Sequence, residues 1–186
     1  MPAAVPEFQL LLTQLAADLG VKVEWLLSRM DRLDQREALA FLTDAYPDLA
    51  MPYIDLAAQT TATFYADQPV APQPPGQEFI PDVPPDLVPA DRLAASARWA
   101  LLQAKPIPAL QGSAMRAVFD GSRDTMIHNA DREKGARWAR HASANACAFC
   151  RMLATRHAVY TSEAAATRVV GRGVDLTEAD RRAIHG

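Results

Sequence analysis

The amino-acid sequence predicts a mostly α-helical protein, and three observations lead to this expectation. Leucine, alanine and aromatic residues recur at intervals of three and four over most of the chain, which places them on one face of a helix. Glycine and proline separate these stretches. Eight of the 14 prolines lie between residues 69 and 89, so one extended segment divides the helical part of the chain in two.

Residues 1–67 are expected to form an N-terminal helical module with four apolar stripes. We expect Gly20 to end the first helix and breakers such as Pro47 to separate the others. The stripes contain, in chain order, Phe8, Leu11, Leu12, Leu15 and Leu19; Leu26, Leu27, Met30 and Leu33; Ala38, Phe41, Leu42 and Ala45; and Tyr53, Leu56, Ala57, Thr60 and Phe64.

Residues 68–90 form the proline-rich segment. Each proline fixes φ and removes a backbone donor, so this segment is expected to be extended. It is either a stiff, passive connector or an arm that lies on a partner. Phe79 and Ile80 are the candidate anchors of such an arm.

Residues 91–186 are expected to form a C-terminal helical module. Asp91 can cap a helix that stops near Pro106, and a longer helix follows. Its small residues Ala114, Ala117 and Gly121 would let another backbone approach closely, and we expect such a face to contact a partner. After a loop at residues 171–173, residues 176–180 start a helix that has fewer than three turns before the sequence stops, so we expect this module to be truncated.

The net charge of −3 conceals an uneven distribution. Residues 1–90 contain 13 acidic and 4 basic residues, whereas residues 91–186 contain 9 acidic and 15 basic residues. This distribution indicates that the two halves face different partners or each other. The alternative is that the charged residues only form the solvent-exposed surface of the helices. No apolar run approaches the ~18 residues of a membrane-spanning helix, and no signal peptide is evident, so we expect a soluble protein without a membrane span.

Both cysteines lie in the sequence CAFC at residues 147–150. Two thiolates at this spacing can hold zinc if two further ligands are present, and His141 and His157 are the nearest candidates. A thioredoxin-like redox role would require a β-α-β context, which the sequence lacks. The remaining alternative is that Cys147 and Cys150 are structural and fix a turn between two helices. We expect no cofactor unless zinc is bound.

Basic residues surround the cysteines, with Trp138 among them. They are suited to contact phosphates or an acidic protein surface, but no groove-reading motif is present. Any contact with packaged double-stranded DNA would therefore lack sequence preference. The candidates are Arg132, Lys134, Arg137, Arg140, Arg151 and Arg156.

The CAFC sequence, the RMLA that follows it at residues 151–154, the pair Val159 and Tyr160, and the SEA at residues 162–164 resemble the signature of MuF-like minor capsid proteins of actinobacteriophages. The similarity extends over residues 91–166 and includes residues 117–125 and 135–140. It implies a virion protein present in several copies, located in the head interior or at the portal vertex and assembled in the host cytoplasm. The implied partners are the portal protein and the major capsid or scaffold protein, and the implied role is head assembly with genome packaging or ejection.

A capsid maturation protease is the competing hypothesis, and a zinc-dependent binding module is the second. A serine protease requires a nucleophile, a base and an orienting group. Serines and four histidines are present, but no GxSxG elbow is found, and His128 lies on a helical face typical of a structural histidine. We therefore expect binding and assembly without catalysis.

Overall fold

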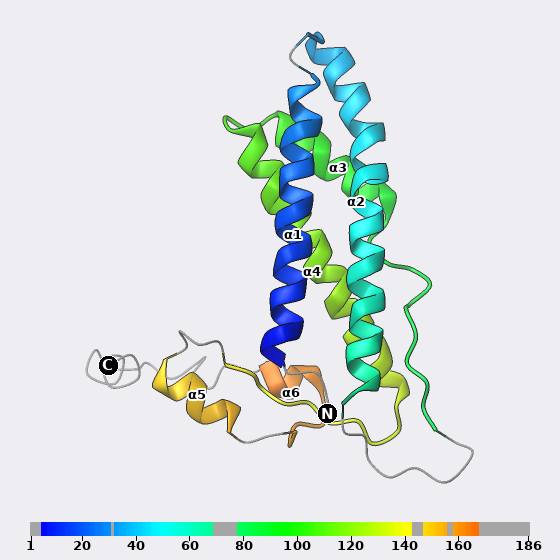
Figure 1. The fold of residues 1–186 in the computed structure, drawn as a ribbon, viewed down its shortest axis with the longest axis vertical. Coiled ribbons are helices and arrows are strands. Elements are labelled where there is room, and N and C mark those ends of the chain that lie inside the picture. The colour runs from blue at the N-terminus through cyan, green and yellow to red at the C-terminus, as the bar shows by residue number, and fades with distance from the viewer. Residues whose placement is uncertain (1–4, 31, 69–77, 143–146, 156–157, 168–186) are drawn as a thin grey trace. The chain divides into compact units, whose positions relative to one another are not determined.

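The computed structural model describes residues 5–30, 32–68, 78–142, 147–155 and 158–167. Within these residues the protein is mostly α-helical, as predicted, with six helices and one isolated β-bridge (Figure 1). The chain divides into two compact units, Met1–Arg132 and Glu133–Gly186. No helix among the described residues has the length and apolar character needed to cross a membrane.

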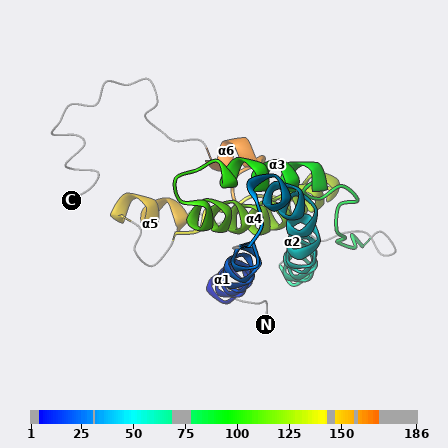
Figure 2. The same cartoon turned by 90° about the horizontal axis from the view of Figure 1, so that it is seen from above.

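The first unit contains four helices in two layers. They are α1 (Val5–Ser28), α2 (Gln35–Ala66), α3 (Ala90–Leu101) and α4 (Pro106–Arg132). Helices α1 and α2 lie side by side and run in opposite directions (Figure 1). Seen from above, α3 and α4 cover one side of this pair (Figure 2).

Helix α1 continues through Gly20, although the sequence predicted a break there. A glycine inside a helix costs about 1 kcal/mol. Leu19 and Val23 on either side are fully buried, and the burial of each such side chain stabilises by about 1.5–3 kcal/mol. The Gly20 carbonyl also accepts a 3.1 Å hydrogen bond from the Gln111 side chain of α4. Tertiary packing therefore outweighs the local preference.

Helix α2 likewise continues through Pro47 and Pro52, so the third and fourth predicted helices are one. An interior proline costs ~3 kcal/mol or more because a backbone hydrogen bond is lost. Tyr46, Ala50 and Ile54, which lie around these prolines, are fully buried and offset that cost. The helix starts at a capping box, in which Asp34 accepts from the Arg36 and Glu37 amides and Glu37 accepts from the Asp34 amide.

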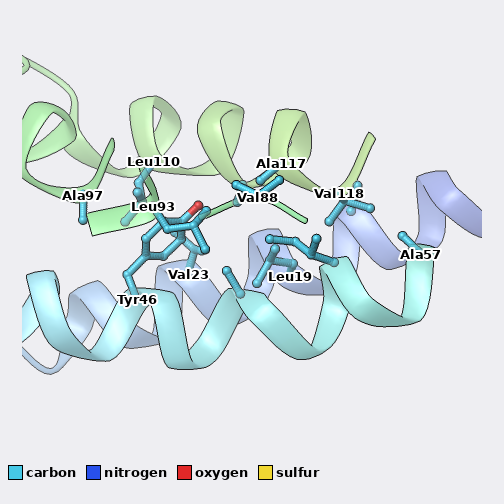
Figure 3. Packing of buried hydrophobic residues seen from close by; sticks show 14 of the residues in the cluster. Leu19, Val23, Tyr46, Ala57, Val88, Leu93, Ala97, Leu110, Ala117 and Val118 are labelled. Carbon is cyan, nitrogen blue, oxygen red and sulfur yellow. The ribbon is translucent and has the colours of Figure 1, made fainter. Parts of the chain in front are cut away.

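The helices before and after the proline-rich segment share one core, whereas the sequence suggested separate modules. Helix α4 packs on both α1 and α2, and α3 packs on α2. A pair of amphipathic helices cannot bury its apolar faces alone, and the second pair supplies the missing cover. Helix α3 begins after Pro89, and Asp91 lies in its first turn instead of capping it. The largest fully buried apolar side chains are Leu19, Val23, Leu42, Tyr46, Ile54, Leu93, Leu110 and Val118, several of which appear in Figure 3.

The small-residue face of α4 is buried inside this unit. A Cβ atom added at Gly121 would lie 2.7 Å from the Ile54 Cγ2 atom and 3.3 Å from the Ile54 carbonyl oxygen. The buried hydroxyls of Thr61 and Ser122 are 2.8 Å apart at the same crossing. The predicted close approach is confirmed, but the partner is α2 of the same chain, so the expectation that this face contacts another protein is wrong.

The second unit contains the short helices α5 (Ala148–Ala154) and α6 (Glu163–Thr167). Trp138 and Tyr160 form an antiparallel bridge with two backbone hydrogen bonds of 2.8 and 3.1 Å. Leu153 of α5 and Ala166 of α6 are buried. The predicted loop at residues 171–173 and the predicted helix start at residues 176–180 lie outside the described residues.

Replacement of Gly121 by alanine tests the crossing of α2 and α4. We expect Gly121→Ala to lower the free energy of unfolding by about 1–3 kcal/mol, because the stiff, buried Ile54 side chain and its backbone must shift. Gly112→Ala in the same helix is the matched control, since a Cβ atom there meets nothing within 4 Å. It should raise stability by about 0.5–1 kcal/mol. Denaturant unfolding measures the stability of both variants. A Gly121→Ala protein as stable as Gly112→Ala would contradict this packing of α2 on α4.

Candidate functional site

The CAFC sequence lies at the start of α5 in the second unit. Cys147 is the N-cap of α5, and its sulfur accepts a 3.4 Å hydrogen bond from the Cys150 backbone N–H. Both cysteines are free thiols; Cys147 is half-buried and Cys150 is exposed. The two sulfurs therefore lie on one turn of chain within reach of solvent.

The surroundings of the two thiols separate their pKa values. The hydrogen bond from the Cys150 backbone N–H, followed by that from the Cys150 thiol, lowers the pKa of Cys147 below its ordinary value, and the charge of Arg151 adds to this. The hydrogen bond to Cys147, followed by desolvation, raises the pKa of Cys150. Cys147 is therefore the sulfur that ionises first.

Trp138, Arg140 and Tyr160 form an aromatic and basic cluster in the same unit. The Arg140 guanidinium carbon lies 5.1 Å from the centre of the Tyr160 ring, a cation–π distance. The β-bridge joins Tyr160 to Trp138. The positive charge of Arg140 also acts on Cys150, opposing the increase in its pKa. The CAFC turn and this cluster are thus neighbours.

The predicted basic residues fall into different environments. Lys134, Arg137 and Arg151 of the second unit are exposed. Arg132 belongs to the end of α4 in the first unit, where it is ion-paired with Asp82. Arg156 lies outside the described residues.

The candidate metal ligands are only partly described. His141 is exposed, and His157 lies outside the described residues. In the part of the chain that the structure describes, no group of three or more His, Cys, Asp or Glu side chains is placed to hold a metal ion.

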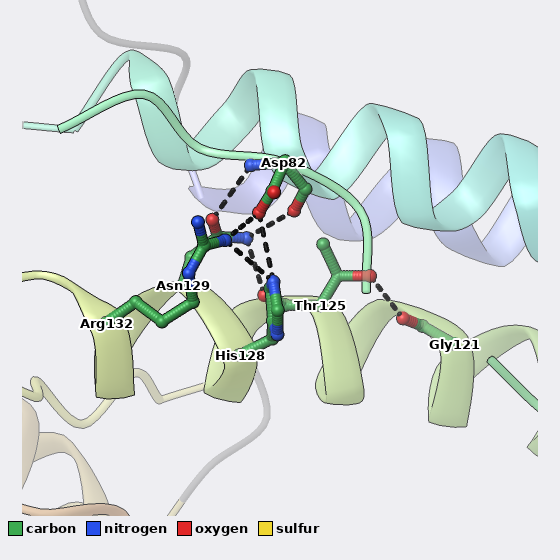
Figure 4. Close-up of polar contacts among 6 residues, drawn as sticks. All are labelled: Asp82, Gly121, Thr125, His128, Asn129 and Arg132. Atoms are coloured by element: carbon green, nitrogen blue, oxygen red, sulfur yellow. Dashed lines mark hydrogen bonds and ion pairs between the residues drawn. The ribbon is translucent and has the colours of Figure 1, made fainter. Parts of the chain in front are cut away.

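A polar cluster on the first unit fastens the proline-rich segment to α4 (Figure 4). The Asn129 side chain is fully buried, accepts from the Asp82 backbone N–H at 2.9 Å and donates to the Asp82 carbonyl at 2.8 Å. The Asp82 carboxylate binds His128 Nε2 at 2.9 Å and the Arg132 guanidinium. Although desolvation opposes ionisation, the hydrogen bonds from His128 and Arg132 hold the pKa of Asp82 below its ordinary value.

The two predicted arm anchors behave differently. The Phe79 ring packs edge-on against Tyr65 at 6.1 Å and lies under Arg132, so it fixes the segment to its own chain. Ile80 is 80% exposed and has its side chain in solvent. The sequence did not predict the role of Asp82 and Asn129, because nothing local connects residues 47 positions apart.

Of the serines and histidines considered for a protease, Ser122, Ser162 and His128 each contact other residues. Ser122 is buried against Thr61, and the Ser162 hydroxyl accepts from the Ala165 amide at the start of α6. His128 is held by Asp82 and Arg132, as expected of a structural histidine. Ser143 lies outside the described residues.

These residues define an α-helical protein that consists of a four-helix unit and a smaller unit with an exposed basic surface. The family model described as VG15 protein matches residues 2–182, and the chain therefore belongs to the VG15 family. This makes it a phage protein, which confirms the phage origin predicted from the CAFC resemblance. No curated protein and no solved structure matches the chain.

Alkylation of the two cysteines tests the order in which they ionise. We expect iodoacetamide to modify Cys147 before Cys150 at the lower end of a series from about pH 6 to pH 9, because thiolate is the reactive form. Exposure alone would favour Cys150. Cys147→Ala should move the reaction of Cys150 to lower pH, because the bond that raises its pKa is lost. Peptide mass mapping that found Cys150 modified first in the native protein would contradict the described geometry.

Proposed function

We propose that this phage protein is a MuF-like minor capsid protein that attaches near the portal and acts in head assembly and in genome packaging or delivery. The observation that carries the proposal is that the CAFC sequence and its flanking residues form a basic unit distinct from an acidic helical unit. Residues 1–132 contain 17 acidic and 10 basic residues, whereas residues 133–186 contain 5 acidic and 9 basic residues.

The basic unit supports binding to an anionic partner. Lys134, Arg137 and Arg151 are exposed, and a β-bridge pairs Trp138 with Tyr160 in the same unit. Such a surface attracts DNA phosphates or an acidic protein face without reading a base sequence. In a phage head, packaged DNA is a partner of this kind, and an acidic face of the portal protein would be another.

The helical unit supports binding through apolar contacts. Leu10, Val21 and Trp25 of α1 are each more than half exposed, and so is Leu102, which follows α3. Ile80 on the proline-rich segment is also exposed. Large apolar side chains in solvent are suited to a protein partner, such as the portal, the major capsid protein or a scaffold protein. The proposal is therefore one of assembly without catalysis.

Quantitative mass spectrometry of phage particles tests this proposal. We expect the chain in both mature particles and DNA-free heads, in a constant ratio to the portal protein and far below the major capsid protein. A portal-attached component requires this ratio, since its copy number follows that of the portal.

Two outcomes would contradict it. Presence in DNA-free heads with absence from mature particles would favour a scaffold or protease role. Loss of head-protein cleavage in a His141→Ala phage, with the chain still incorporated, would identify a protease. Arg98→Ala, an exposed position on α3 of the other unit, is the control for nonspecific effects of substitution on incorporation.

A further inference from the structure

A pocket with a volume of about 120 Å³ lies between α3 and α4 in the first unit. Arg92 and Ser96 line it from α3, and Ser113 and Arg116 line it from α4. Val88 and Leu93 are apolar parts of its wall. Hydrogen-bonding groups therefore face this space from both helices.

The arginines leave the pocket with uncompensated positive charge. Arg92 is paired with Asp120 at 2.7 Å, and Arg123 also approaches that carboxylate at 3.6 Å. Arg116 is exposed and makes no ion pair with any residue that the structure describes. The Asp120 carboxylate thus pairs with Arg92 and Arg123, and the guanidinium of Arg116 remains available to an anion.

The buried hydroxyl of Tyr46 lies beside Ser113 of the pocket. The Tyr46 side chain is fully buried, and its oxygen points towards Val88 and Leu93 (Figure 3). Burial raises the pKa of Tyr46 well above its ordinary value, and the neighbouring Ser113 side chain opposes part of this shift. The Tyr46 hydroxyl therefore stays protonated. The Ser113 hydroxyl can accept a hydrogen bond from the Tyr46 hydroxyl while it donates its own into the pocket. A bound acceptor would therefore give the Ser113 donor a partner.

We propose that this pocket binds a phosphate group. Donors on two opposite walls suit a tetrahedral anion, whose oxygens point in several directions, better than a planar carboxylate. Guanidinium groups form paired, charge-assisted hydrogen bonds with phosphate. The phosphate comes from inorganic phosphate, a nucleotide or the DNA backbone. The proposal concerns the four-helix unit and is independent of the role of the basic unit in the head.

Titration of the full chain with inorganic phosphate, followed by calorimetry and by amide NMR shifts, tests the proposal. We expect shifts at Ser96, Ser113 and Arg116, and a loss of affinity of about tenfold or more in Arg116→Gln, because a charge-assisted bond is removed. Arg116→Lys should retain part of the affinity. Arg98→Gln on the exposed side of α3, outside the pocket, is the matched control and should change affinity by less than about twofold.

Three results would overturn the proposal: no phosphate binding, equal losses in Arg116→Gln and Arg98→Gln, or acetate binding as tightly as phosphate. Competition identifies the source of the phosphate. Displacement of inorganic phosphate by a nucleoside monophosphate supports the pocket as a site for free phosphate compounds. Displacement by a short DNA duplex, with the same loss in Arg116→Gln, supports it as a backbone contact.

Discussion

The close crossing of α2 and α4 is the contact on which the rest of the described first unit depends. Gly121 lies against Ile54 with no room for a side chain, and the hydroxyls of Thr61 and Ser122 meet in the buried layer beside it. A hydrogen bond in such a position is costly to leave unmade, which restricts how the two helices slide past each other. The crossing sets the position of α4. Helix α4 in turn places Arg116 opposite α3 and Asn129 against Asp82 of the proline-rich segment.

Two polar sites follow from this position of α4. Near its middle, Ser113 and Arg116 face α3 across the pocket. Near its end, Asn129 holds both backbone groups of Asp82, and His128 and Arg132 hold its carboxylate. The proline-rich segment is therefore an integral part of the four-helix unit over its described residues, and Val88 from this segment is buried in the core. Among its described residues, Ile80 is exposed and can offer an apolar contact.

The helical class and the close approach at Gly121 could be predicted from the spacing of apolar and small residues, which acts locally. The absence of helix and strand over residues 78–89 could be predicted from the prolines. The continuity of α1 through Gly20 and of α2 through Pro47 could not, since it depends on burial against helices distant in sequence. The partnership of Asp82 with Asn129, and the pocket between Arg92 and Arg116, likewise join residues from separate elements. For the CAFC turn, the sequence indicated the pair of thiols but not which of them ionises first, because that depends on the hydrogen bonds at the start of α5.

An asymmetric reconstruction of the portal vertex, compared between wild-type heads and heads that lack this chain, tests the proposed role most directly. The account predicts additional helical density beside the portal, with the long antiparallel pair α1 and α2 recognisable in it. Density spread evenly over the capsid lattice, or an unchanged portal vertex, would contradict the assignment as a portal-associated minor capsid protein.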